Sequence, residues 1–238
     1  MLDGLNEDFK MVMRGWHKTN LLPIYDQTKN VIGDLRKKEK IPPEYMYWWT
    51  SYVKNSIILF EIMMIDKYSN QSAFTMRILM EISADVLFMS AQQENIERFR
   101  KHYIDEPRKI KNCSYSDFVI ISKKLKMFDY DAGKEIETRK RIQLAFGKEG
   151  VVFYDYLCCY THLNYIGVIK DIDTTIDKDG ELEYRLEFVK YYPDTFSTMI
   201  RALEIFSGES DLFDKIDTKK MRRVITDLVE KHSLGKIE

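Results

Sequence analysis

Three charged side chains stand at steps of four residues in an apolar segment, and they are the first candidates for chemistry in this chain. Arg77, Glu81 and Asp85 fall within residues 74–89. Residues four apart lie on the same side of an α-helix, so the three charges form one stripe. A helix that is apolar on most of its circumference is normally buried, and buried charge is costly unless it is paired. The stripe therefore indicates either a satisfied ion-pair network or a functional site.

A second helical segment carries a histidine among cysteines and tyrosines. His162 follows Asp155, Cys158 and Cys159 by seven, four and three residues, which places all four on one helical face. Imidazole titrates near neutral pH, so a histidine there is suited to general acid–base catalysis. The alternative is a core histidine that is hydrogen-bonded to a carboxylate or a tyrosine.

Metal and cofactor chemistry find little support in the sequence. A zinc site built from the two cysteines fails because adjacent residues diverge by about 100° on a helix. A di-iron bundle would need Glu-x-x-His repeats, which are missing. No Gly-rich phosphate loop, Walker motif or Gly-x-Ser-x-Gly elbow occurs. We expect neither a metal nor a cofactor.

The elements that position these residues are mostly helices. The 238 residues include only 10 Gly and 5 Pro, and this scarcity of breakers favours long helices. Pro42-Pro43 begins a long helix that ends near residue 67, since proline suits a first helical turn. The helix of the charged stripe follows after a short polar turn, so the two should pack as an antiparallel hairpin. Gly147 and Gly150 flank a break before a buried helix over 151–168.

One segment near the C-terminal third has a different period. Apolar side chains alternate with charged ones at Leu182, Tyr184, Leu186 and Phe188. A period of two is typical of a β-strand, and the preceding Asp-Lys-Asp-Gly has the composition of a turn. We therefore predict a β-hairpin at 171–189.

These elements predict a mainly α fold, an up-and-down helical bundle with one inserted β-hairpin. We expect one domain over 1–238, with a helical N-terminal arm (1–41), a bundle core (42–170), the hairpin, and C-terminal helices (193–234). The formal net charge of -1 gives no global basic field that would indicate nucleic-acid binding. The longest apolar stretch, 56–65, is too short to span a bilayer, and no signal peptide is apparent. Three cysteines without a spaced framework favour a cytoplasmic location.

The two special helices carry a family resemblance. The pair Arg77 and Glu81, followed by a tyrosine-rich helix from Tyr154 to His162, resembles a group of bacterial helical domains distantly similar to the HEPN superfamily. HEPN proteins are helical bundles of toxin–antitoxin, abortive-infection and other antiviral systems, and many are metal-independent RNases. The resemblance covers about residues 42–170.

The sequence departs from the HEPN nuclease signature at one point. That signature places Arg and His on one helix with four to six residues between them. Arg98 and His102 have three residues between them, and no Arg lies shortly upstream of His162. Arg77 would therefore have to supply the positive charge from another helix.

The resemblance implies an HEPN-like protein of bacterial or phage conflict, with RNA as a partner. In a metal-independent endoribonuclease, Arg77 would stabilise the charge of a pentavalent phosphorane. His162 would deprotonate a ribose 2′-hydroxyl or protonate the leaving oxygen. Glu81, Asp85 and Tyr154 are the other candidate catalytic residues.

The alternative is a non-catalytic interaction or scaffold module. In it the charged stripe and His162 form a neutralised network, and function lies on aromatic surface such as Tyr45, Trp48 and Trp49. A homodimer or a partner protein suits either hypothesis. An enzyme needs His162 and Arg77 to face a common cleft, whereas a scaffold predicts that both are sealed and paired.

Overall fold

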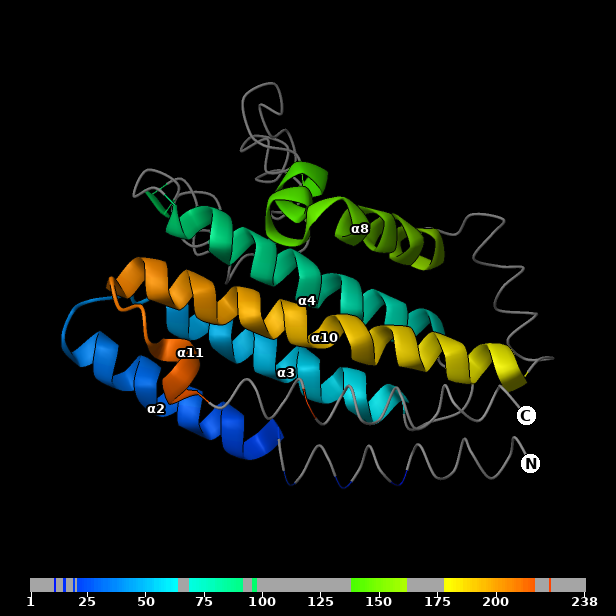
Figure 1. Cartoon of the computed structure of the whole chain (residues 1–238), viewed down its shortest axis with the longest axis horizontal. Coiled ribbons are helices and arrows are strands. Elements are labelled where there is room, and N and C mark those ends of the chain that lie inside the picture. Colours follow the sequence, from blue (N-terminus) through cyan, green and yellow to red (C-terminus); the bar gives the residue numbers. More distant parts are fainter. Residues whose placement is uncertain are drawn as a thin grey trace, which may run out of the picture.

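The fold is a bundle of helices. The computed structural model describes residues 21–63, 69–91, 138–161 and 178–216, together with positions 11, 15, 19, 96, 97 and 223. Within these ranges there are six helices and no strand, which confirms the mainly α prediction (Figure 1). The helices are α2 (Leu22–Lys37), α3 (Tyr45–Met63), α4 (Ser69–Ser90), α8 (Thr138–Thr161), α10 (Lys178–Ser207) and α11 (Leu212–Lys215).

Helix α4 lies at the centre of the packing. It contacts α3, α8 and α10, while α2 packs on α3 and the short α11 packs on α10. α3 and α4 run in opposite directions side by side, as the predicted hairpin requires (Figure 1). One face of α4 is thus buried against α3 and α10, and α8 covers another.

The predicted β-hairpin at 171–189 is wrong for the residues that the structure describes. Residues 178–189 form the first part of α10, and 171–177 lie outside the described residues. The alternating segment consists largely of Glu, Leu and Arg, which are strong helix formers, and it also places apolar residues four apart. A period of two over eight residues therefore also fits a helix. The helix expected to begin near Pro193 instead passes through this residue.

The core between α2, α3 and α10 is aromatic. It includes the buried residues Tyr25, Tyr45, Trp48, Trp49, Tyr52, Tyr192 and Phe196. Their rings meet mostly edge-on or tilted, as electrostatics between π-systems favours; the centroids of Trp49 and Phe196, for example, are 5.9 Å apart. Trp48 and Trp49 are only 7% and 3% exposed, so the aromatic surface expected for a scaffold is in fact interior.

Four tyrosines in this core, Tyr25, Tyr45, Tyr52 and Tyr192, form a set that we call the tyrosine core. All four are buried, and each hydroxyl has a hydrogen-bond partner. Tyr45 donates to the carbonyl oxygen of Met199 at 2.6 Å, and the Tyr52 hydroxyl lies 2.8 Å from that of Thr195. The hydroxyls of Tyr25 and Tyr192 bond to each other. Polar atoms this deep are tolerated because they are neutral and satisfied.

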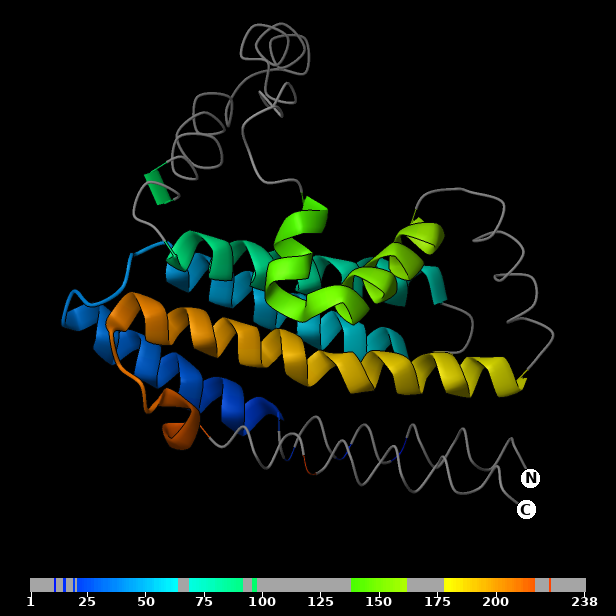
Figure 2. The same ribbon diagram turned by 45° about the horizontal axis from the view of Figure 1, so that its top comes forward.

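Helix α8 is bent sharply at Gly147 (Figure 2), which confirms the predicted break. Gly147 has φ 72° and ψ -167°, a backbone conformation that residues other than glycine rarely adopt. Arg139 and Asp155 would be about 24 Å apart along a straight helix, yet their side chains form an ion pair at 2.7 Å. α8 is therefore two arms joined at an elbow.

A second glycine allows the elbow to close. A Cβ atom added at Gly150 would lie only 2.2 Å from the Cβ atom of Phe146. Because that neighbour is fixed to the backbone, a larger residue at 150 would require the elbow to shift.

Candidate functional site

The charged stripe of α4 meets α8 in a polar contact zone that we call the seam, formed by Arg77, Glu81, Asp85, Arg141 and Tyr154. The Arg77 Nε atom donates to Glu81 Oε1 at 2.8 Å, and the Tyr154 hydroxyl donates to the same oxygen at 2.6 Å. The Arg77 guanidinium carbon lies 5.6 Å from the centroid of the Tyr154 ring, within cation–π range. One carboxylate oxygen thus joins a residue of the same helix to a residue of the facing one.

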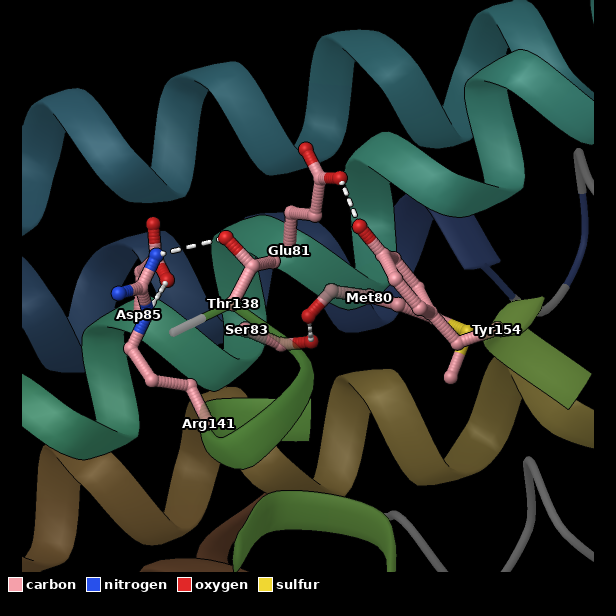
Figure 3. A network of polar contacts seen from close by, with 7 residues as sticks. All are labelled: Met80, Glu81, Ser83, Asp85, Thr138, Arg141 and Tyr154. Atoms are coloured by element: carbon pink, nitrogen blue, oxygen red, sulfur yellow. Dashed lines mark hydrogen bonds and ion pairs between the residues drawn. The ribbon is translucent and has the colours of Figure 1, made fainter. Parts of the chain in front are cut away.

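Asp85 takes part in a separate pair two turns away from Arg77. Arg141 Nε lies 2.6 Å from Asp85 Oδ1, and the same guanidinium donates to the Thr138 hydroxyl at 3.2 Å (Figure 3). This pair ties the first arm of α8 to α4, whereas Tyr154 ties the second arm to α4. The seam therefore holds both arms of the bent helix.

The seam lies at intermediate depth. The side chains of Arg77 and Glu81 are 22% and 30% exposed, and those of Arg141 and Asp85 are 18% and 34% exposed. Solvent screens ion pairs at this depth, so each contributes only modestly to stability. The charges of the stripe are paired, but the stripe is half-buried and not fully sealed.

The local environment keeps the seam in defined protonation states. Burial disfavours the charge of Arg77, but the Glu81 carboxylate more than offsets this and holds the pKa of Arg77 above its usual value. Burial, then the hydrogen bond to Glu81, raises the pKa of the Tyr154 hydroxyl well above its usual value. Desolvation raises the pKa of Asp85 despite the opposing charge of Arg141. At neutral pH Arg77 is a cation and Tyr154 is neutral.

The cysteine next to the seam is a poor nucleophile. Burial raises the pKa of the Cys158 thiol, and the nearby Arg77 opposes this only in part. Because the thiolate is the reactive form, this environment favours an inert thiol. Cys158 and Cys159 are both free of disulfides.

The described residues bring together only part of the predicted site. Arg77, Glu81 and Tyr154 contact one another, and Asp85 belongs to the neighbouring pair. His162 lies outside the described residues. In the parts of the chain that are described, no three His, Cys, Asp or Glu residues gather in a way that could hold a metal ion.

Sequence reasoning missed the arginines of α8 that take part in these contacts. Arg139 and Arg141 belong to a basic run that is typical of a solvated helix face. Only the elbow at Gly147 turns Arg139 towards Asp155, and only the docking of α8 on α4 brings Arg141 to Asp85. The sequence offered one signal: Asp85 and Asp155 lie on largely apolar helices, where a carboxylate requires a cationic partner.

No family model, curated protein or solved structure matches this chain. Among the described helices, none is long and apolar enough to cross a bilayer.

Proposed function

We propose that this protein is an HEPN-like helical protein of bacterial or phage conflict that acts by binding a partner, without catalysis at the seam. The observation that carries the proposal is the pairing of charge: Arg77 is matched by Glu81, and Asp85 by Arg141. The scaffold alternative requires this pairing of Arg77. The meeting of Arg77, Glu81 and Tyr154 supports the HEPN-like part, because these residues carry the resemblance.

The chemistry of the paired groups favours binding over cleavage. A guanidinium that stabilises a phosphorane must direct its charge at the phosphoryl oxygens, and Glu81 already neutralises Arg77 at 2.8 Å. Tyr154, with its raised pKa, does not supply a base near neutral pH. Removing one partner of such a network should therefore lower the free energy of unfolding, and it should not change a rate of RNA cleavage.

A second candidate is a metal-independent RNase that uses His162 and Arg77. It is favoured by the approach of Arg77 to the second arm of α8 at Tyr154, because His162 comes directly after Thr161, the last residue of this helix. In this hypothesis His162 acts as general base or acid and Arg77 as the electrostatic stabiliser.

The two candidates make opposite predictions in one experiment. Wild type, His162→Ala, Arg77→Ala and a control, Arg36→Ala, are expressed in a bacterial host and then purified and incubated with RNA in EDTA. Arg36 is exposed on α2 and lies outside the seam, so it controls for the loss of one positive charge. The binding proposal predicts intact RNA with all four proteins. Growth arrest and RNA fragmentation with wild type and Arg36→Ala alone would overturn it in favour of the RNase.

A further inference from the structure

A pocket of about 370 Å³ lies at the elbow of α8, away from the seam. Phe146, Glu149 and Gly150 of the elbow form one wall, and Phe213 of α11 contributes a second aromatic ring. Helix α10 contributes further lining residues. The volume is in the range of small-molecule sites, which are concave and combine apolar walls with a few polar groups.

Helix α10 contributes a polar row with opposite charges at its two ends. Asp194, Ser197, Thr198 and Arg201 line the pocket at successive turns of one helical face. Asp194 and Arg201 are seven residues apart, which is about 10 Å along the helix axis. The pocket is therefore negative at one end of this row and positive at the other.

Two charged side chains of the pocket, Glu149 and Arg201, are available to a ligand. Neither Glu149 nor Arg201 has a hydrogen-bond or ion-pair partner in the part of the chain that the structure describes, although both line the same cavity. The seam differs, because there each charge has an opposite partner within 2.8 Å. Both side chains are exposed, so a ligand that entered could pair with them without first breaking an internal ion pair.

The walls define the remaining chemistry. Phe146, Tyr191 and Phe213 offer aromatic surface, and Tyr191 is held in place by stacking on Phe153 at a centroid distance of 4.0 Å. A flat ring packs well on such surface. The pocket contains both carboxylates and a guanidinium, so it suits a ligand with one cationic and one anionic group. The cationic group would face a carboxylate, and the anionic group would face Arg201.

We propose that the elbow pocket binds a zwitterionic amino acid with an aromatic side chain, whose carboxylate pairs with Arg201 and whose ammonium group pairs with Glu149. The ring lies against the aromatic walls. This site is independent of the seam and of the function proposed above.

The ligand classes can be separated with four probes of the full chain by isothermal titration calorimetry. L-phenylalanine carries all three groups; phenethylamine lacks the carboxylate, 3-phenylpropionate lacks the ammonium group, and L-alanine lacks the ring. We expect saturable binding of L-phenylalanine with a Kd below about 1 mM, and binding at least about tenfold weaker for each other probe. Absence of saturable binding of L-phenylalanine at about 10 mM would overturn the proposal, and so would binding of phenethylamine or 3-phenylpropionate as tight as that of L-phenylalanine.

Two variants assign the charges, and a third controls for them. Arg201→Met should weaken L-phenylalanine and 3-phenylpropionate at least about tenfold and leave phenethylamine unchanged, whereas Glu149→Gln should weaken L-phenylalanine and phenethylamine. Arg36→Met, an exposed arginine outside the pocket, should bind as wild type does. Since both pocket side chains are exposed, melting temperatures should be unchanged. Wild-type affinity in both pocket variants would reject the site.

Discussion

The tyrosine core and the seam are two polar clusters in one helical bundle, and they differ in how polar groups are accommodated between packed helices. The core places four hydroxyls in the interior, where all four residues are at most 4% exposed, and pairs them as neutral hydrogen bonds. The seam places arginines and carboxylates between α4 and α8, where 18–34% of each charged side chain remains exposed. The deeply buried cluster is therefore neutral, and the charged cluster is partly exposed.

The difference follows from the free energy of desolvation. Moving an ion from water into the interior costs several kcal/mol even after relaxation, whereas a satisfied hydroxyl costs far less. A bundle can thus keep a polar network deep inside if the network is neutral. The charged stripe of α4 is tolerated because α8 covers it only in part and supplies partners for it. If this explanation holds, the two clusters should respond differently to pH, mutation and salt.

The largest effect should come from alkaline pH. Burial raises the pKa of Tyr25, Tyr45, Tyr52 and Tyr192 above the ordinary value near 10. Their contribution to stability is therefore complete below that pH and is lost as pH rises above it, because the unfolded chain releases these protons first. The loss is about 1.4 kcal/mol per pH unit for each tyrosine, or about 5.5 kcal/mol per unit for the four together.

This prediction is measured by following helical circular dichroism together with tyrosinate absorbance from neutral pH upwards. The buried tyrosines should ionise only as the helices unfold, in one cooperative step. Complete tyrosinate absorbance in a protein that keeps its helical signal would show that these hydroxyls are accessible.

Removal of one core hydroxyl should have the next largest effect. Tyr52→Phe removes a buried hydrogen bond to the Thr195 hydroxyl, which keeps only its bond to the Tyr192 carbonyl oxygen, so the free energy of unfolding should fall by about 1–2 kcal/mol. Tyr47→Phe is the matched control, since Tyr47 is 67% exposed and should change stability by less than about 0.5 kcal/mol. Urea denaturation measures both. Equal stability of the two variants would mean that the core hydrogen bonds contribute nothing.

In the seam, Glu81→Gln should destabilise the protein by about 1 kcal/mol. The change removes the charge that holds Arg77 and weakens the acceptor of Tyr154, but partial exposure limits the effect. Glu61→Gln on the exposed side of α3 is the control. A double-mutant cycle with Arg77→Met isolates the pair; a coupling energy of zero would mean that the ion pair seen between α4 residues does not stabilise the fold.

The smallest effect, and the sharpest contrast, should be the response to salt. Raising NaCl from about 0.05 M to about 1 M screens half-exposed charges, so the destabilisation by Glu81→Gln should shrink by a few tenths of a kcal/mol. The destabilisation by Tyr52→Phe should not change, because neutral hydrogen bonds are not screened. Equal salt dependence in both variants would remove the distinction between the clusters.

Local sequence patterns predict much of the helical framework. The long helices α3 and α4, the helix before residue 38 and the break at Gly147 all have local signals, namely proline near a first turn, a period of four and glycine at a turn. The first part of α10 was mistaken for a hairpin because eight residues of alternating polarity are compatible with both structures. The choice depended on continuation into the downstream helix and on packing against α4.

For the candidate site, the sequence alone determined which residues need partners, and the tertiary structure decided which partners they have. Arg77, Glu81 and Asp85 had to share one face because helical geometry depends only on spacing along the chain. That Tyr154 reaches Glu81, and that Arg141 reaches Asp85, depends on the bend of α8 and its docking on α4, which are set by contacts between residues far apart in sequence. The burial of Trp48 and Trp49 was undecided for the same reason: an aromatic stripe is the same in sequence whether a neighbouring helix covers it or water does.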